Sequence, residues 1–217
     1  MPNLAEQYSL SEQQYLAGEP NSPIKHEYID GGVYAMAGAS ANHNLITGNI
    51  FGELRNHLKG QPCRPFTSDM KVKIGSRYFY PDVLVDCADY AGDDQFTETP
   101  TLIVEVLSKS TRRMDETTKR SSYSQIDSLQ EYLLIEQDIV DVELVRRRNG
   151  WRSEHFFMGD QFTLESVGLT LSVAEIYDRV KNADVTEWLL QQVAQAEADA
   201  PASMTAATHT AATDQPS

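Results

Sequence analysis

Residues 101–107, which read TLIVEVL, decide the fold of this chain. The run is almost wholly apolar, as expected of a central β-strand that is covered on both faces. Two segments on its C-terminal side, residues 131–136 (EYLLIE) and 139–146 (IVDVELVR), predict further strands. A single acidic residue, Glu105, interrupts the apolar pattern of the central strand.

The segments before the central strand also predict β-structure. Residues 70–74 alternate apolar residues with lysines, which is typical of a half-exposed strand. Residues 78–86 are rich in strand formers, but Pro81 interrupts them and predicts a sheet edge or a bulge. Nearer the N-terminus, the Asp-Gly-Gly sequence within residues 27–37 predicts a β-hairpin.

Helical patterns separate these strands. Residues 42–59 carry apolar side chains along one helical face, and residues 111–127 are polar and compatible with a helix. A capping box at residues 9–12 predicts a short helix that Gly18 ends. A second capping box, at residues 172–175, predicts the start of helices over about residues 173–197. The order of elements predicts an α/β fold with a mixed sheet sandwiched by helices.

The length of the chain, 217 residues, suits one domain with its own core. We expect this domain to cover residues 1–197 and the low-complexity segment 198–217 to be a disordered tail. No signal peptide or membrane span is recognisable, so we expect a cytoplasmic protein with no membrane partner. Cys63 and Cys87 lack metal-binding spacing and are expected to be reduced and mostly buried, with a disulfide as the alternative.

The charge of the chain restricts its partners. The net charge of −14 argues against a protein that coats nucleic acid without specificity, because affinity for phosphate comes from Lys and Arg. Most of the basic residues nevertheless fall within residues 64–80, 109–120 and 146–152. They either form scattered solvated faces or contribute to a side that faces phosphates.

Asp82 and Glu105 are the candidate centre of a site. Asp82 stands in a Pro-Asp dipeptide after the strand break, and Glu105 follows 23 residues later inside the apolar strand. A carboxylate in such a strand must be paired, protonated or bound to a metal. Two carboxylates from adjacent strands form an all-oxygen site suited to Mg²⁺ or Mn²⁺. The alternative is a structural ion pair of Glu105 with Arg112 or Arg113.

A lysine near this pair would add to its chemistry. Asp115, Lys119 and Tyr123 are spaced four residues apart, so on a helix they share one face. If that face turns toward Glu105, the lysine orients the attacking water or stabilises charge that develops on a phosphoryl group. The alternative is a surface ion pair between Asp115 and Lys119, worth about 0.3–0.5 kcal/mol.

Several motifs occur in an order that resembles a known group. The strings HEYIDGGVYAMAG, NHN, YPDVLVDC, LIVEVLSKSTRRMDETTKRSSY and EYLLIE resemble the Uma family of bacterial restriction endonucleases, within the PD-(D/E)XK nuclease superfamily. The resemblance covers about residues 9–180. It implies the restriction-endonuclease-like fold, a mixed central sheet flanked by helices, with a divalent metal and a homodimer.

The chain departs from the superfamily pattern at one position. That pattern places a lysine two residues after the glutamate, where this chain has Leu107. The resemblance to the Uma pattern assigns the role to Lys119 on the following helix, with Lys109 as a lesser candidate. It also places an acid, Glu27, just before the hairpin turn as an addition to the metal site, with a surface hairpin residue as the alternative.

Other residues are weaker candidates. Asp69 and His43 are less favoured, and His43 stands near a helix start, where capping or core packing is commoner. The run Arg146-Arg147-Arg148 either contacts phosphates or forms a solvated strand end.

The sequence thus predicts a Mg²⁺- or Mn²⁺-dependent endonuclease that hydrolyses DNA phosphodiester bonds. Asp82 and Glu105 would hold the metal with a backbone carbonyl near Val106, and Lys119 and Glu27 would complete the catalytic set. The first alternative is an inactive nuclease-fold module that binds nucleic acid or protein, and the second is a hydrolase of smaller phosphate esters. The direction of the Lys119 side chain, toward the carboxylates or toward solvent, separates the enzyme from the binding module.

Overall fold

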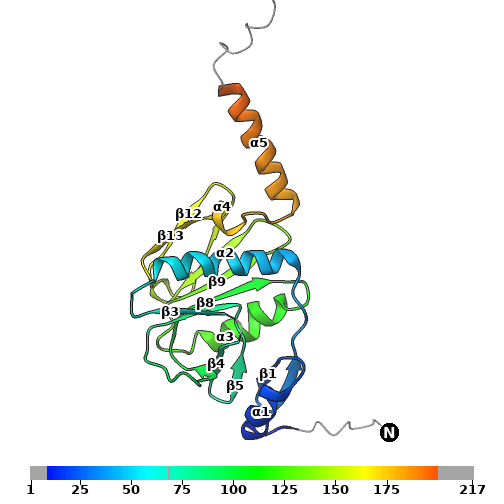
Figure 1. Ribbon diagram of the computed structural model, residues 1–217, viewed down its shortest axis with the longest axis vertical. Helices are drawn as coiled ribbons and strands as arrows, with labels where there is room; N and C mark the ends of the chain where they lie inside the picture. The colour runs from blue at the N-terminus through cyan, green and yellow to red at the C-terminus, as the bar shows by residue number, and fades with distance from the viewer. Residues whose placement is uncertain (1–8, 68, 200–217) are drawn as a thin grey trace, which may run out of the picture.

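The computed structural model describes residues 9–67 and 69–199 (Figure 1). Its body is built from two β-sheets, a small hairpin and several helices, which confirms the predicted mixed α/β class. The structure differs from the expectation of a single sheet, because a second sheet joins a helix in covering one face of the central one.

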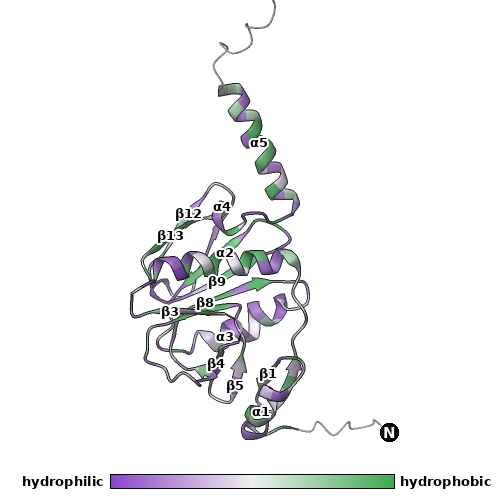
Figure 2. Cartoon of the chain, viewed as in Figure 1, coloured by the Kyte–Doolittle hydropathy of each residue, from purple (hydrophilic) through white to green (hydrophobic). Residues whose placement is uncertain are grey.

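The central sheet has six strands, of which β8 and β9 are parallel and all other neighbours antiparallel. In spatial order they are β11 (Ser153–Phe156), β10 (Val142–Arg146), β9 (Glu131–Glu136), β8 (Pro100–Leu107), β6 (Val83–Asp86) and β3 (Arg64–Thr67). The predicted central strand is β8, and it lies inside this sheet with seven of its eight residues buried. Figure 2 shows that β8 and β9 are predominantly hydrophobic.

The second sheet has five strands and is formed mainly by the N-terminal half of the chain. In spatial order they are β2 (Gly32–Ala35), β1 (His26–Ile29), β5 (Arg77–Phe79), β4 (Lys71–Ile74) and β7 (Phe96–Thr97). The predicted hairpin is β1–β2, and its turn uses positive φ at Asp30 and Gly31. A separate two-stranded hairpin consists of β12 (Gln161–Leu164) and β13 (Leu169–Ser172).

The helices vary in length and position. They are α1 (Glu12–Gly18), η1 (Glu19–Asn21), α2 (Ala41–His57), η2 (Met114–Lys119), α3 (Arg120–Tyr123), η3 (Arg147–Asn149), α4 (Val173–Ile176) and α5 (Ala183–Asp199). Helix α2 begins where the Ser40 hydroxyl accepts a hydrogen bond from the backbone N–H of His43. Its buried residues Ile46, Ile50 and Leu54 recur every four positions and face the sheet.

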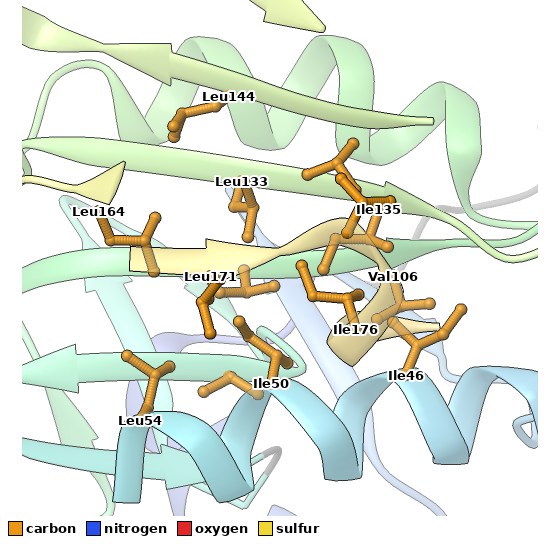
Figure 3. Packing of buried hydrophobic residues seen from close by; sticks show 14 of the residues in the cluster. Ile46, Ile50, Leu54, Val106, Leu133, Ile135, Leu144, Leu164, Leu171 and Ile176 are labelled. Atoms are coloured by element: carbon orange, nitrogen blue, oxygen red, sulfur yellow. The ribbon is translucent and has the colours of Figure 1, made fainter. Parts of the chain in front are cut away.

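Two hydrophobic clusters lie on opposite faces of the central sheet. Alternate residues of β8 divide between them, because successive side chains of a strand point to opposite faces. Leu102, Val104 and Val106 pack with α2, α4 and the β12–β13 hairpin in the larger cluster, part of which Figure 3 shows. Ile103 and Leu107 pack with the second sheet and with residues near α3. Glu105 therefore points to the same face as Ile103 and Leu107.

Three local expectations need correction. Pro81 lies neither at a sheet edge nor in a bulge; it lies between β5 and β6, where the chain passes from one sheet to the other. The first helix is capped two residues later than predicted, because Ser11 and Gln14 form its capping box. Lys71 is buried, so β4 is less exposed than its alternation suggests.

The C-terminal part of the chain leaves the body as one helix. Figure 1 shows α5 projecting away from the sheets. The predicted tail, residues 198–217, lies outside the described residues except at positions 198–199, which belong to α5. Within the described part of the chain, no helix combines the length and the apolar character that a bilayer crossing requires.

Cys63 and Cys87 form a disulfide, which corrects the expectation of reduced thiols. The antiparallel pairing of β3 with β6 explains their meeting, because Arg64 pairs with Asp86 and the next residues outward are the two cysteines. Cys87 is exposed and Cys63 only half-buried, so neither is a buried core thiol. The bond is at odds with the predicted cytoplasmic location, since disulfides are rare in reducing compartments.

We expect replacement of both cysteines by serine to lower the free energy of unfolding by about 3 kcal/mol, because the bond closes a loop in the unfolded chain. Urea unfolding of the wild type and of the Cys63→Ser/Cys87→Ser variant measures this difference. A reductant should destabilise the wild type alone. Two titratable thiols in denatured, unreduced protein would contradict the assignment.

Candidate active site

Asp82 and Glu105 lie next to each other at one end of the central sheet. Val83 of β6 pairs with Val104 of β8, and this register places the preceding residue, Asp82, beside Glu105. The Val106 backbone N–H donates a 2.7 Å hydrogen bond to Asp82 Oδ2. The convergence of these two carboxylates from adjacent strands agrees with the prediction made from the sequence.

The ammonium group of Lys119 contacts three carboxyl groups. Its Nζ is 2.9 Å from Glu27 Oε1, 3.0 Å from Glu105 Oε1 and 3.0 Å from Asp115 Oδ1. We call Glu27, Glu105 and Asp115 the carboxylate cluster. All three residues are buried, and Lys119 is only 4% exposed. The ion pair of Asp115 with Lys119 is therefore internal, and the alternative of a surface pair is wrong.

Hydrogen bonds from neighbouring groups fix the carboxylate cluster. The Tyr123 hydroxyl donates to Glu105 Oε1 at 2.9 Å, and the Tyr80 backbone N–H donates to Glu27 Oε1 at 3.2 Å. The Tyr132 hydroxyl donates to the Asp115 carbonyl at 3.2 Å and so ties the π-helical segment η2 to β9. As predicted, Asp115, Lys119 and Tyr123 share one face, and that face turns toward Glu105.

Three carboxyl groups share a single lysine in this cluster. Burial raises the pKa of Glu105 well above its usual value; Lys119 opposes this, and the neighbouring carboxylates add to it. Burial also raises the pKa of Asp115. Burial by itself lowers the pKa of Lys119, but the three carboxylates outweigh it and hold that pKa well above its usual value. Lys119 is therefore a cation at neutral pH.

His43 is another ionisable group at this site. It lies in the first turn of α2, and its Nε2 is 3.3 Å from Asp82 Oδ2. Burial lowers the pKa of His43, but Asp82 and the Val106 backbone outweigh it, so that the pKa is raised. His43 is a weak candidate from the sequence because nothing in the chain order shows that the start of α2 meets the residue before β6.

Other candidates lie elsewhere. Arg112 forms an ion pair with Glu136. This excludes the alternative in which Arg112 pairs with Glu105. Lys109 is exposed. The Asp69 side chain is 87% exposed and contacts Lys25 at 2.5 Å, away from the carboxylate cluster.

Leu107 shows why the lysine of the superfamily pattern is absent. Its side chain belongs to the hydrophobic cluster under the second sheet, where it is 3% exposed. An ammonium group there would have to leave water among apolar side chains. Lys119 approaches the same face of β8 from the η2–α3 segment and brings its charge to Glu105 from a different direction.

The arginine run divides between the interior and the surface. Arg146 is buried and paired with Glu131 and Glu154, which corrects both readings for that residue, whereas Arg148 is exposed just after the strand, as the solvated-end alternative predicts. Arg147 donates to the Leu129 carbonyl, and Arg148 pairs with Glu165. These arginines stabilise the fold through internal and local contacts.

The donor atoms of the site are of the kind that hard divalent cations prefer. Carboxyl oxygens come from Asp82, just before β6, and from residues of β8, β1 and η2. Within residues 9–67 and 69–199, however, no three His, Cys, Asp or Glu side chains are arranged around one point as metal ligands. The physical reason is that the Lys119 ammonium lies where the carboxylate cluster converges.

Comparisons with known proteins agree with this geometry. Residues 12–174 match the model of the Uma2 family, described as "Putative restriction endonuclease". Two uncharacterized proteins of Synechocystis sp. (strain ATCC 27184 / PCC 6803 / Kazusa) are similar to this chain. The first is 37% identical, over 77% of this chain and 91% of that protein. The second is 40% identical, over 62% of this chain and 78% of that protein. A crystal structure of a "putative nuclease belonging to DUF820" from Anabaena variabilis ATCC 29413 has a TM-score of 0.67 at 18% identity, over 79% of this chain and 99% of that one.

We expect Lys119→Met to lower the free energy of unfolding by about 3–5 kcal/mol at pH 8, because it leaves buried carboxylates without their cation. Urea unfolding in the presence of a chelator measures the effect. The matched control is Lys59→Met, which removes an exposed lysine and should change stability by less than about 0.5 kcal/mol. Adding Glu105→Gln to Lys119→Met should restore part of the lost free energy of unfolding. If the effects of the two substitutions on that free energy are simply additive, the interaction within the cluster is contradicted.

The raised pKa of Glu105 also predicts a pH dependence. The folded state retains a proton that the unfolded state releases, so this contribution is complete below the unfolded pKa and is lost as pH rises through the folded pKa. Between pH 5 and 8, the metal-free wild type should therefore lose more stability than Glu105→Gln. Asp127→Asn, at an exposed position, should follow the wild type. If the free energy of unfolding changes with pH in the same way for wild type and Glu105→Gln, the raised pKa of Glu105 is contradicted.

Proposed function

We propose, from the premise that this chain belongs to the Uma2 family, that it is a divalent-metal-dependent endonuclease that hydrolyses DNA phosphodiester bonds. The observation that carries the proposal is the buried Lys119 ammonium, held 3.0 Å from Glu105 at the strand end beside Asp82. A purely structural ion pair would not need three buried carboxylates around one lysine, because surplus buried charge costs free energy.

Asp82, Glu105 and the Val106 carbonyl are the groups that would hold Mg²⁺ or Mn²⁺. When bound, such an ion polarises a phosphoryl oxygen and lowers the pKa of water. Asp82 is the most accessible of these carboxylates, with a side chain 15% exposed, against 4% for Glu105. The oxygen donors of the site support this proposal, because hard divalent cations prefer carboxylate and carbonyl oxygens as ligands.

The protonation state of Lys119 limits what it can do. An ammonium with a raised pKa donates hydrogen bonds and does not accept a proton. We therefore assign Lys119 the role of orienting the attacking water and stabilising negative charge on the phosphoryl oxygens, and not that of a general base. Glu27 and Asp115 hold the ammonium in place, and Tyr123 holds Glu105.

The substrate must overcome the charge of the site. Carboxylates repel the phosphates of DNA, and two arginines of the η2–α3 region, Arg112 and Arg120, are paired with Glu136 and Glu143. The metal would therefore serve substrate binding as well as the chemical step. The expected homodimer would present two such sites to the two strands of a duplex.

The second candidate function is a binding module that has kept the nuclease fold. The observation that favours it is Leu107, which replaces the lysine of the strict pattern with a buried apolar side chain. The inward direction of Lys119 favours the enzyme instead, because in a module without catalysis nothing would maintain this costly cluster.

We expect the wild type to cleave plasmid or single-stranded DNA in Mg²⁺ or Mn²⁺ and not in a chelator. Asp82→Asn, Glu105→Gln and Lys119→Met should each slow cleavage by at least about 100-fold, the usual effect of removing one group that stabilises a transition-state charge. Gel assays over time measure the rates.

The matched control for charge is Asp127→Asn, which removes an exposed carboxylate and should cleave like the wild type. DNA binding without cleavage in either metal would favour the binding module. Cleavage that survives Asp82→Asn would place the chemistry elsewhere.

A further inference from the structure

A cavity of about 280 Å³ lies between the η2–α3 segment and the strands β9 and β10. Its floor is apolar and fully buried, and it consists of Tyr123, Leu129, Tyr132 and Val145. Its mouth is polar, with exposed residues of the η2–α3 segment around it. The proposed reaction makes no use of this space.

Trp151 lines the cavity from a strained backbone conformation. Its φ is 61°, in the left-handed region that favours glycine and that a bulky residue rarely adopts. Its backbone N–H donates to the Arg146 carbonyl at 2.9 Å, and the Arg147 guanidinium lies over its ring, 5.1 Å from the ring centre. Strain of this kind gathers at ligand-binding sites. The fold thus keeps an indole ring at the cavity in spite of the cost in free energy.

The size and chemistry of the cavity suit a flat aromatic ligand. An apolar cavity of about 150 Å³ is enough for one benzene molecule, so about 280 Å³ suits a fused pair of rings. Tyrosine and tryptophan side chains bind such rings by stacking or by edge contacts.

The mouth adds hydrogen-bonding groups of both kinds. The Glu116 carboxylate, whose contact with Arg112 is long at 3.7 Å, accepts hydrogen bonds, and the Ser121 hydroxyl can donate them. The Thr117 hydroxyl donates to the Arg113 carbonyl and keeps its acceptor capacity. A purine base has the matching combination of a flat double ring and an edge of mixed donors and acceptors.

The cavity shares a wall with the carboxylate cluster. The Tyr123 ring lines the cavity, and its hydroxyl donates to Glu105 Oε1 at 2.9 Å. The Tyr132 ring lies beside it, with 5.3 Å between the ring centres, and its hydroxyl donates to the Asp115 carbonyl at 3.2 Å. One tyrosine side chain therefore connects the cavity to Glu105, and a ligand in the cavity lies close to the proposed point of cleavage.

We propose that this cavity is a nucleobase pocket whose ligand is a purine. The base comes either from a free nucleoside or from the DNA strand. The second source rests on the proposed function, because a strand held for cleavage beside Glu105 would place a base that has left its stack in the pocket. The pocket would then give the enzyme a preference for a purine near the cleaved bond, which the proposed function by itself does not assign.

The first test is the fluorescence of Trp151. The chain has two tryptophans, so Trp188→Phe leaves Trp151 as the reporter. With a chelator present, adenosine or guanosine should quench its emission in a saturable way, and ribose 5-phosphate, which lacks a base, should not. Equally strong binding of cytidine would contradict the preference for a purine.

A blocked cavity provides the second test. Ser124 is half-buried and lines the cavity, so the phenyl ring of Ser124→Phe would occupy the space of the base. Purine binding should weaken at least about 10-fold, the usual effect of losing one contact between a base and an aromatic side chain. The control Ser110→Phe adds the same ring at an exposed position outside the cavity lining and should bind as before. The titration of the Trp188→Phe protein decides the question even if Ser124→Phe does not fold.

Oligonucleotides identify the source of the base. A single-stranded purine oligomer should quench Trp151, in a chelator or in Ca²⁺, and an abasic strand of the same length should not. Quenching by the oligomer assigns the pocket to the DNA strand, and quenching by nucleosides alone assigns it to a free ligand. Equal quenching by the abasic strand would contradict base recognition.

The cleavage assay separates this inference from the proposed function. If neither nucleosides nor the oligomer quench Trp151 at millimolar concentration, the nucleobase pocket is wrong, and metal-dependent cleavage by the same protein would leave the proposed function intact. Purine binding without cleavage in Mg²⁺ or Mn²⁺ would keep the pocket and remove the nuclease.

Discussion

The contact on which the rest of the site depends is the burial of one ammonium, that of Lys119, among three carboxylates. Each carboxylate comes from a different element, so the contact ties β1, β8 and η2 together. Taking such charges out of water costs free energy that their mutual attraction only partly returns. The arrangement persists because the surrounding sheets and tyrosines fix it.

The two-sheet architecture makes this burial feasible. The second sheet covers the face of β8 on which Glu105 lies, and its β1 strand supplies Glu27. The passage of the chain through Pro81, between the sheets, puts Asp82 at the border of the buried region. The result is a site with a dry interior, where the ammonium is held, and a more accessible border at Asp82 and His43. Buried ionisable groups with shifted pKa values are typical of functional sites.

Arginine placement also follows from this architecture. The chain is strongly acidic, and one of its arginines, Arg146, is buried between Glu131 and Glu154. Affinity for DNA phosphates would then depend on a bound cation more than on a basic surface.

The sequence alone predicts the elements whose pattern is local: the apolar run of β8, the helical face of α2 and the Asp-Gly hairpin turn. A strand break and a lone acid in an apolar strand also mark Asp82 and Glu105 as candidates, and the register of β6 and β8 shows that they meet. Three other contacts become visible in the folded chain alone: His43 faces Asp82, Arg112 pairs with Glu136, and the two cysteines are bonded. Those contacts join elements distant in the chain, and periodicity carries no information about which elements become neighbours.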